Sequence, residues 1–450
     1  MNLTRITAFT AGLACVAAAL VSTSVGSASA APTASSEGIL CQPGGPTFTM
    51  STATGHISMP DGNVLFSWGF STDTHGFELP GPALCVNQGD NVTITLTNTL
   101  DEDTSLVFPG QSGVLADGQP SLPVVNAGKV TSLAPVATKN GGSVTYQFVA
   151  DAPGTYLYES GTDPAKQVEM GLYGAIIVRP TTKDANGIPQ LTKDANGNPQ
   201  AYGDPRTAYQ PTREFLHILS QVDPKLHLAV EQKKPFDWSS YSAKYFLING
   251  RSAPDSVSPN NASWLPSQPQ GSMVHVTEQV QPGVARTSLG DKMPALVRYI
   301  NVMPTDVAFH PHGNTERVIA EDGASLDNAT LPDSSYGKFL VDVGSNRTVD
   351  ALFAWTNVEN YDPVANPVPV QIAPFQDVLT SASTWYAMSP YLGQTGELPA
   401  GIASMNVCGE YYHMAHNHAL QFATNYGASF GGQMTLIRID PADSLLCPAS

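Results

Sequence analysis

The feature that most constrains the fold is a regular alternation of apolar and polar residues in short runs. In "NVTITLTNTL" (91–100), Val, Ile and Leu alternate with Thr, which is the period-two pattern of a strand with one buried face. Further strand-like runs, such as "SVTYQFVA" and "TVDALFAW", are separated by segments rich in Gly (39) and Pro (36). No run has a helical period long enough for an α/β fold. The sequence therefore predicts an all-β protein.

Length and charge limit the function classes. A chain of 450 residues is long enough for two or three domains, each with its own core. The formal net charge is −17 and only 13% of residues are charged. This balance argues against a nucleic-acid partner, because phosphates need Lys and Arg. It is consistent with solubility outside the cell.

The strand pattern falls into two stretches separated by a turn-rich segment. We expect one β-sandwich over residues 38–180 and a second over 213–442. Between them, residues 181–212 contain two near-identical copies, "TKDANGIPQ" and "TKDANGNPQ". Each copy has an Asn-Gly, which favours a hairpin, so this segment is predicted to be a linker with a small hairpin. Its Asp residues lack the spacing of a calcium cage.

The N-terminus has the pattern of a secretory signal. Arg5 precedes an apolar stretch over 6–21, and Ala28-Ser29-Ala30 fits cleavage by a signal peptidase. The stretch is too short for a convincing membrane span, and no other segment is expected to cross a membrane. A lipid anchor at Cys15 is an alternative, although a glycine stands where a large aliphatic residue is expected. The sequence predicts a signal peptide over 1–30 and a secreted protein.

Four cysteines remain after removal of the signal: Cys41, Cys85, Cys408 and Cys447. In an oxidising compartment four cysteines most often form two disulfides, with three possible pairings. We favour Cys41–Cys85 and Cys408–Cys447, because each pair then lies within one proposed domain. A metal-binding thiolate at Cys408 is the alternative.

The second proposed domain contains two His-x-His pairs. His310 and His312 lie in "AFHPHGN", and His416 and His418 lie in "YYHMAHNHALQ". Residues i and i+2 of a strand point to the same side, so each pair presents two imidazoles along one face. Neutral imidazole is a ligand of copper, zinc, iron and nickel. The two pairs predict a metal site, with ordinary polar residues at strand ends as the alternative. By strand parity, His413 belongs to the opposite face.

These segments resemble the multicopper oxidases, whose domains are cupredoxin β-sandwiches. The resemblance covers roughly residues 50–180 and 210–440. It rests on "LPGPALCVNQGDNVTITLTNTLDEDTSL" and "GTYLYESGTDPAKQVEMGLYGAIIVRP", then on "FLINGRSAPD", "FHPHGN" and "YYHMAHNHALQFATNYGASFGGQM". It implies an all-β fold of tandem cupredoxin-like Greek-key β-sandwich domains. It also implies copper as cofactor and a small-molecule reductant with oxygen as substrates. Related two-domain proteins are often homo-oligomers.

The departures from the family pattern matter as much as the matches. In the family, four His-x-His motifs supply eight histidines to a three-copper cluster, and a cysteine binds a blue copper. Here Val107-Phe108-Pro109 and Glu159-Ser160-Gly161 stand at the first two motifs. Asn417 stands at the position of the cysteine, and Val307 at that of a blue-copper histidine. Met434 occupies the position of the weak axial ligand and is interpreted as core packing.

The prediction is a reduced copper site that holds one ion or a closely spaced pair. Its candidate metal ligands are His310, His312, His416 and His418. Three functions remain open: oxidation of a small reductant with oxygen, non-enzymatic extracellular copper binding, and a metal-free scaffold. The sequence leaves open whether the site is catalytic, and zinc remains an alternative metal. A nitrite-reductase-like function is disfavoured, because it needs the cysteine that Asn417 replaces.

Four neighbours of the histidines have two interpretations each. Asn314 and Glu316 could orient the ligands, but surface polarity explains them equally well. Tyr411 and Tyr412 could assist electron transfer, but packing is the favoured interpretation.

Overall fold

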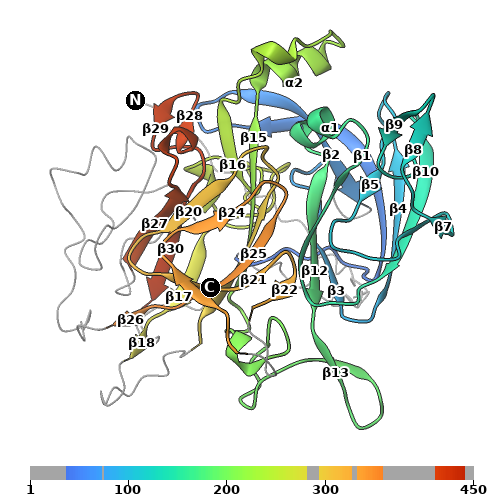
Figure 1. Ribbon diagram of the computed structural model, residues 1–450. Helices are drawn as coiled ribbons and strands as arrows, with labels where there is room; N and C mark the ends of the chain where they lie inside the picture. The colour runs from blue at the N-terminus through green and yellow to red at the C-terminus, as the bar shows by residue number, and fades with distance from the viewer. Residues whose placement is uncertain (1–36, 73–75, 281–292, 327–331, 358–410, 441–450) are drawn as a thin grey trace, which may run out of the picture. The chain divides into compact units, whose positions relative to one another are not determined.

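The computed structural model describes residues 37–72, 76–280, 293–326, 332–357 and 411–440 (Figure 1). Strands dominate the described residues, and the α-helices among them are two short ones, α1 (Pro164–Met170) and α2 (Pro224–Glu231). The all-β prediction is therefore confirmed. The predicted signal peptide over 1–30 and the predicted Cys408–Cys447 pair lie outside the described residues.

The first sandwich packs two sheets together. The strand orders are β2-β1-β4-β10-β6-β7 and β3-β12-β11-β5, and these non-consecutive neighbours are typical of Greek-key connections. A small hairpin pairs β8 with β9. In β4, which was predicted from its alternation, every second residue is buried. The bounds are β1 (Thr47–Ser58), β2 (Val64–Thr72), β3 (Leu84–Asn87), β4 (Asn91–Asn98), β5 (Leu106–Val107), β6 (Leu115–Ala116), β7 (Gln119–Pro120), β8 (Val124–Asn126), β9 (Lys129–Ser132), β10 (Gly142–Val149), β11 (Gly154–Ser160) and β12 (Tyr173–Arg179).

The second sandwich is built in the same way from larger sheets. One sheet runs β22-β21-β25-β19-β15-β16-β28-β29, with β23 beside β21, and the other runs β17-β30-β27-β20-β24. Strands β18 and β26 pair separately. The bounds are β15 (Glu214–Val222), β16 (Tyr245–Ile248), β17 (Val274–Thr277), β18 (Gln279–Val280), β19 (Ala295–Asn301), β20 (Val307–Pro311), β21 (Glu316–Glu321), β22 (Ala324–Ser325), β23 (Tyr336–Lys338), β24 (Val341–Val343), β25 (Thr348–Phe353), β26 (Thr356–Asn357), β27 (Tyr411–Asn417), β28 (Thr424–Asn425), β29 (Ala428–Ser429) and β30 (Met434–Asp440).

A short hairpin lies between the strands of the two sandwiches. It consists of β13 (Thr181–Lys183) and β14 (Pro189–Leu191) in the first copy of the repeated segment. The carboxylate of Asp184 accepts hydrogen bonds from two backbone N–H groups of the turn, at 2.8 and 2.9 Å. This bonding stabilises the turn without a metal ion. The domain boundaries at 38–180, 181–212 and 213–442 remain a prediction.

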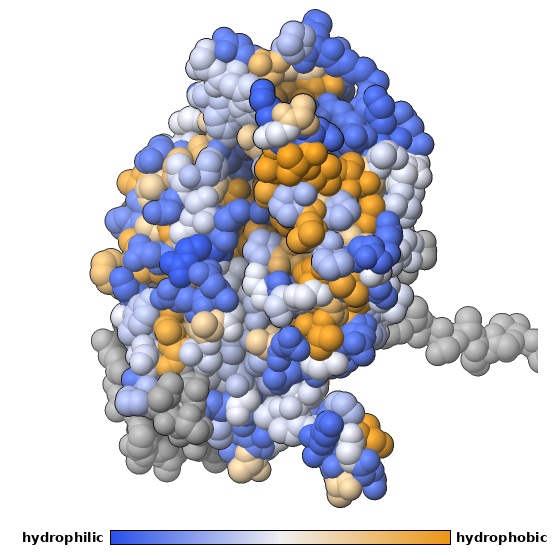
Figure 2. All heavy atoms as spheres, turned by 45° about the vertical axis from the view of Figure 1, so that its right-hand side comes forward, coloured by the Kyte–Doolittle hydropathy of each residue, from blue (hydrophilic) through white to orange (hydrophobic). Residues whose placement is uncertain are grey.

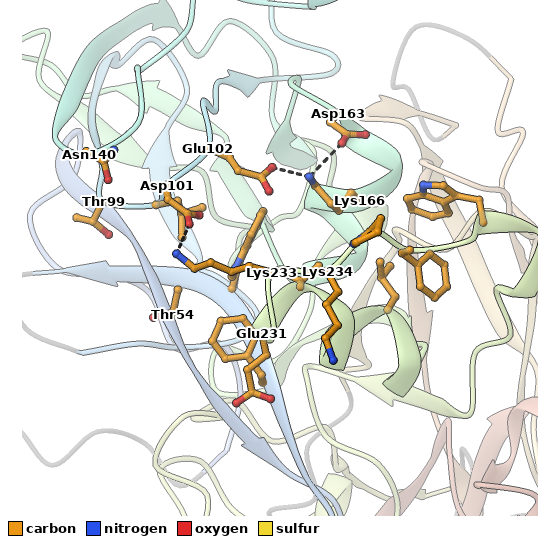
Figure 3. A pocket seen from close by; sticks show the side chains of 18 residues that line it. Thr54, Thr99, Asp101, Glu102, Asn140, Asp163, Lys166, Glu231, Lys233 and Lys234 are labelled. Atoms are coloured by element: carbon orange, nitrogen blue, oxygen red, sulfur yellow. Dashed lines mark hydrogen bonds and ion pairs between the residues drawn. The ribbon is translucent and has the colours of Figure 1, made fainter.

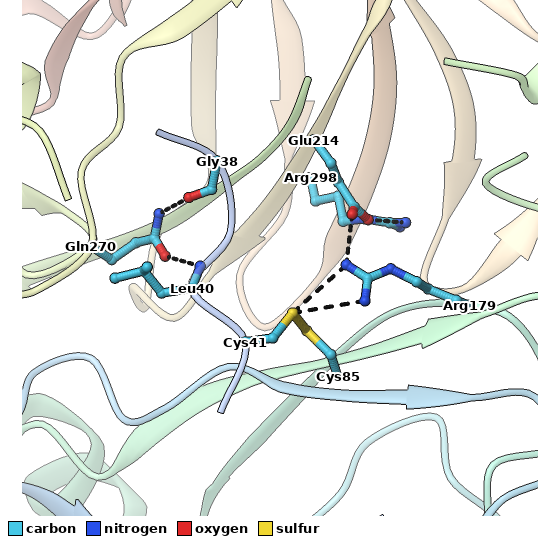
Figure 4. The surroundings of a disulfide bond; sticks show 8 residues. All are labelled: Gly38, Leu40, Cys41, Cys85, Arg179, Glu214, Gln270 and Arg298. Carbon is cyan, nitrogen blue, oxygen red and sulfur yellow. Dashed lines mark hydrogen bonds and ion pairs between the residues drawn. A yellow bond between two sulfur atoms is a disulfide. The ribbon is translucent and has the colours of Figure 1, made fainter. Parts of the chain in front are cut away.

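The predicted Cys41–Cys85 disulfide is confirmed (Figure 4). It joins the segment before β1 to β3, with the two Cα atoms 5.5 Å apart.

No helix of the described residues is long and apolar enough to cross a membrane. The face of the molecule in Figure 2 gathers apolar side chains in one area bordered by polar ones. Exposed apolar residues of the first sandwich include Leu122, Val125 and Val130.

A segment of the second half of the chain covers the first sandwich. This segment, residues 223–241, leaves the end of β15, forms α2 and returns to β16; we call it the strap. Asp223 caps α2 by accepting from the N–H of Lys225 at 2.8 Å. Leu226 is fully buried in the core of the first sandwich. The ring nitrogens of His227 lie 2.6 and 3.2 Å from the carbonyl oxygens of Phe66 and Glu169. The strap is therefore anchored by apolar and polar contacts.

A buried ion-pair network also links strands of the two sandwiches. Arg298 in β19 is fully buried and donates to Glu214 in β15 and to Asp350 in β25, each at 2.8 Å. It also donates to the Thr155 hydroxyl in β11 at 3.0 Å. Arg179 in β12 donates to Glu214 at 2.7 Å, and Figure 4 shows this contact beside the disulfide. These five residues form what we call the Arg298 network.

For the carboxylate of Glu214, attraction to the two buried arginines outweighs the cost of burying its charge. Burial raises the pKa of Glu214, but the charges of Arg298 and Arg179 lower it further, to about 2. Because the folded-state pKa lies below the ordinary value of 4.5, the stabilisation is present above pH 4.5 and is lost as the pH falls toward 2.

We predict that Arg298→Met lowers the free energy of unfolding by about 3–5 kcal/mol at pH 7, because it leaves buried carboxylates without their partner. The loss should shrink as the pH falls from about 4.5 toward 2. Chemical denaturation across this pH range measures both effects. Arg347→Met is the control, since Arg347 pairs with Asp322 at the surface and should cost at most about 1 kcal/mol. An equal effect of the two substitutions would contradict the role of the Arg298 network.

Candidate metal centre

Strand pairing places the two His-x-His pairs side by side. β20 and β27 are antiparallel neighbours, and His310 lies directly opposite His416 in the register. His312 and His418 follow the two strands, and the backbone N–H of each donates to the opposite strand, at 2.9 and 2.7 Å. Opposed residues and their i+2 neighbours share one face of a sheet. The four predicted site residues therefore lie on the same face.

The four imidazole rings are in mutual contact. The centroids of His310 and His312 are 4.6 Å apart, and those of His416 and His418 are 5.7 Å apart. Between the strands, the separations are 5.1 Å for His310–His418, 5.1 Å for His312–His416 and 5.8 Å for His310–His416. The Nε2 atoms of His312 and His416 are 3.0 Å apart. The structure thus brings together all four histidines that were singled out by their spacing.

The environment favours neutral imidazole. Burial, together with the neighbouring rings of His416, His310 and His418, lowers the pKa of His312 to about 4. Burial also lowers the pKa of His416. Neutral imidazole is the form that binds metal ions, because its second ring nitrogen carries a free lone pair.

Backbone carbonyl groups orient two of the rings. Nδ1 of His310 is hydrogen-bonded to the carbonyl oxygen of Phe339, and Nδ1 of His416 lies 2.8 Å from the carbonyl oxygen of Asn417. Bonds of this kind fix the tautomer and leave Nε2 for a ligand. The role of Phe339 could not be predicted, because this residue lies 29 positions from His310 and contributes only a backbone atom.

The donor set fits a metal that prefers nitrogen ligands. Metal–imidazole bonds are about 2.0 Å long, so two ring nitrogens bound to one ion lie roughly 3–4 Å apart. The 3.0 Å separation of the Nε2 atoms of His312 and His416 is within this range. In the described part of the chain, no group of three or more His, Cys, Asp or Glu is already arranged to hold a metal ion. Binding of one ion by all four histidines therefore requires some rearrangement of their side chains.

The blue-copper positions of the family are filled by core packing and hydrogen bonds. Val307 is buried in the apolar core of the second sandwich. Asn417 is fully buried and donates to the Gln433 side chain at 2.8 Å. Gln433 in turn donates to the carbonyl oxygens of two strands, at 3.1 and 3.2 Å. Met434 packs in a small apolar cluster with Met414, as expected for a core methionine.

The first two motif positions meet on neighbouring strands but offer no imidazole. Val107 in β5 lies opposite Glu159 in β11, and Phe108 packs in the core of the first sandwich. Glu159 is buried and accepts from the Asn346 side chain at 2.7 Å. Burial raises its pKa to about 7.

One interpretation of the neighbouring residues is wrong. Glu316 is buried rather than at the surface, and its carboxyl group accepts from the Tyr299 hydroxyl at 2.9 Å. Burial raises the pKa of Glu316 to about 7. Glu316 is therefore not a polar surface residue, and its carboxyl group bonds to Tyr299 rather than to one of the four histidines. Asn314 is exposed and donates to the carbonyl oxygen of Ala354.

Other residues of β27 near His416 pack into the protein. The ring of His413 lies against that of Trp355, with centroids 4.5 Å apart, and burial together with the nearby His312 ring lowers its pKa to about 4. Tyr412 is buried, as the packing interpretation requires. The side chain of Tyr411 lies outside the described part of the structure.

We predict that Asn417→Ala lowers the free energy of unfolding by about 1–3 kcal/mol, because it leaves the buried Gln433 oxygen without its donor. Thermal and urea denaturation of the metal-free protein measure the loss. Asn314→Ala, which removes the exposed asparagine, is the control and should cost less. An unchanged stability of Asn417→Ala would show that the buried amide network does not fill the place of the missing cysteine.

Comparison with known proteins gives the same family as the motifs. A family model described as multicopper oxidase matches residues 73–183. A laccase of Aspergillus fumigatus is 38% identical over 106 residues, and an L-ascorbate oxidase of Cucumis sativus is 36% identical over 103 residues. Each match covers 23% of this chain but only 16% of the relative's own length. The range matched by the family model, residues 73–183, includes the two substituted motifs of the first sandwich. The four histidines lie beyond this range.

Solved structures match most of the chain. A blue copper oxidase from Nitrosomonas europaea has a TM-score of 0.52 at 16% identity, covering 88% of this chain and 85% of that one. The multicopper oxidase mgLAC has a TM-score of 0.51 at 17% identity, covering 90% and 87%. At this identity the likeness shows the fold alone, which is that of cupredoxin-like domains. The chain is therefore similar to the multicopper oxidases over residues 73–183 and has a cupredoxin-like fold.

Proposed function

We propose that the protein is an extracellular copper protein that oxidises a small reductant with oxygen at the four-histidine centre. The observation that carries the proposal is the meeting of two His-x-His pairs, with the Nε2 atoms of His312 and His416 3.0 Å apart. The signal-like N-terminus and the Cys41–Cys85 disulfide support an oxidising compartment.

The residues of the centre favour direct contact with the reductant. A bound copper ion supplies one-electron redox chemistry. Because Asn417 replaces the cysteine ligand, no separate blue-copper centre is expected to receive electrons first. His418 is exposed and His310 half-buried, so a small reductant can approach the centre from solvent. Dioxygen is the proposed electron acceptor.

A specific observation favours a second function. At the sites where the family holds further copper ligands, this chain has a buried amide network at Asn417 and a buried carboxyl group at Glu159. These replacements remove the ligands of the blue copper that receives electrons and of the rest of the three-copper cluster. The four histidines are retained. A non-enzymatic extracellular protein that binds or sequesters copper needs only the part that remains.

We predict one or two copper ions per chain after loading and removal of excess metal. Replacing two ligands in His416→Ala/His418→Ala should abolish this binding, because at most two imidazoles remain. Elemental analysis per chain measures it, with zinc loaded in parallel to test the alternative metal. His56→Ala is the control, since His56 lies at the surface beside Glu231. Absence of tightly held metal in the unmodified protein would contradict the copper site and leave the metal-free scaffold as the remaining function.

We predict slow oxygen uptake by the copper-loaded protein with a phenol as reductant, in proportion to its copper content. The double histidine variant should show none after the same loading treatment, because the ions that accept electrons are missing. An oxygen electrode measures the rate. Stoichiometric copper without uptake above the level of the variant would contradict the oxidase and support the copper-binding alternative.

A further inference from the structure

A second candidate site lies between the strap and the first sandwich (Figure 3). It is a pocket of about 790 Å³, within the size range of ligand sites in proteins. Its lining comes from β1 and β2, the segment after β4, the start of α1, and the strap. None of the four histidines contributes to it. Because Leu226 and His227 anchor the strap on the first sandwich, the pocket is already formed without a ligand.

One wall of the pocket is an exposed aromatic ring held in place by its neighbours. Trp238 is 47% exposed. Its ring stacks on Tyr241, with centroids 6.2 Å apart and an interplanar angle of 27°. It also meets the edge of Phe236 at 5.4 Å. The carboxylate of Asp237 accepts from the N–H of Ser239 at 3.0 Å, which fixes the turn that carries the ring. An exposed, immobilised indole offers a flat apolar surface to a ligand.

Five of the seven charged residues that line the pocket are paired with one another, whereas Glu231 and Lys234 are outside these pairs. Lys233 lies 2.5 Å from Asp101, and Lys166 lies 2.5 Å from Glu102 and 3.4 Å from Asp163. Figure 3 shows these pairs among the residues that line the pocket. A charged ligand would have to compete with an existing partner at each of these groups. A neutral ligand with many hydroxyl groups can instead donate to the carboxylates and accept from the ammonium groups without separating the pairs.

The aromatic wall continues beyond this pocket. Trp238 also lines a second pocket of about 390 Å³, together with Tyr241 and Val302. A ligand that passes over Trp238 therefore finds space on both sides of it. This favours an elongated molecule over a single small ring.

We propose that the two pockets form a binding site for a neutral oligosaccharide. The apolar face of one sugar ring lies on Trp238. The hydroxyl groups bond to the paired side chains around Lys166 and Lys233, and the chain extends past Trp238 into the second pocket. This site is separate from the histidine centre, so it holds whether or not the protein binds copper.

The test is binding of the whole protein to soluble neutral polysaccharides, measured by affinity electrophoresis. A β-glucan, a xylan and a mannan are the neutral probes, and polygalacturonate and chitosan are the charged ones. We expect retardation by at least one neutral polysaccharide. Trp238→Ala should weaken binding by about tenfold or more, as expected for an aromatic residue at the centre of a binding site.

Two further variants make the test specific. Trp264→Ala is the matched control, because Trp264 is 46% exposed but lines neither pocket; it should bind as the unmodified protein does. Glu102→Gln keeps the shape of the pocket and should also weaken binding. It takes the place of Trp238→Ala if thermal unfolding shows that Trp238→Ala does not fold. The proposal is overturned if no neutral polysaccharide binds or if only the charged probes bind. It is equally overturned if folded Trp238→Ala, or Glu102→Gln in its place, binds as tightly as Trp264→Ala.

Discussion

The buried Arg298 guanidinium is the interaction on which the rest of the structure depends. It joins β15, β19 and β25 of the second sandwich to β11 of the first. β19 then leads through a short turn into β20, which carries His310. Asn301, at the end of β19, donates to the carbonyl oxygens of Thr305 and Val343 at 2.8 and 2.9 Å and so fixes this turn. Buried polar contacts therefore hold the turn that precedes the strand of the first histidine pair.

The four-histidine cluster retains two of the family's His-x-His motifs, while the other ligand positions carry different residues. The remaining imidazoles come from two directly paired strands, so the sheet alone brings them together. The other metal positions of the family are occupied by groups that the protein core can satisfy. At Asn417 the thiolate is replaced by an amide that bonds to Gln433. At Glu159 an imidazole is replaced by a carboxyl group that bonds to Asn346.

Several features could be predicted because they depend on local pattern. Alternation identified β4, strand parity placed the four histidines on one face, and the location of Cys41 and Cys85 in one proposed domain favoured their pairing. Other features depend on contacts between distant residues. Arg298 meets residues 84 and 52 positions away, and the strap buries Leu226 in the other sandwich. No local pattern encodes such partners. Glu316 was misjudged for the same reason, because its partner Tyr299 lies on another strand.

Anomalous X-ray scattering at the copper absorption edge, from crystals of the copper-loaded protein, would test the central claim most directly. The account predicts a peak among the side chains of His310, His312, His416 and His418, and none beside Asn417 or Glu159. A peak elsewhere on the protein, or none in a crystal grown from copper-loaded protein, would contradict a copper centre built from these four residues.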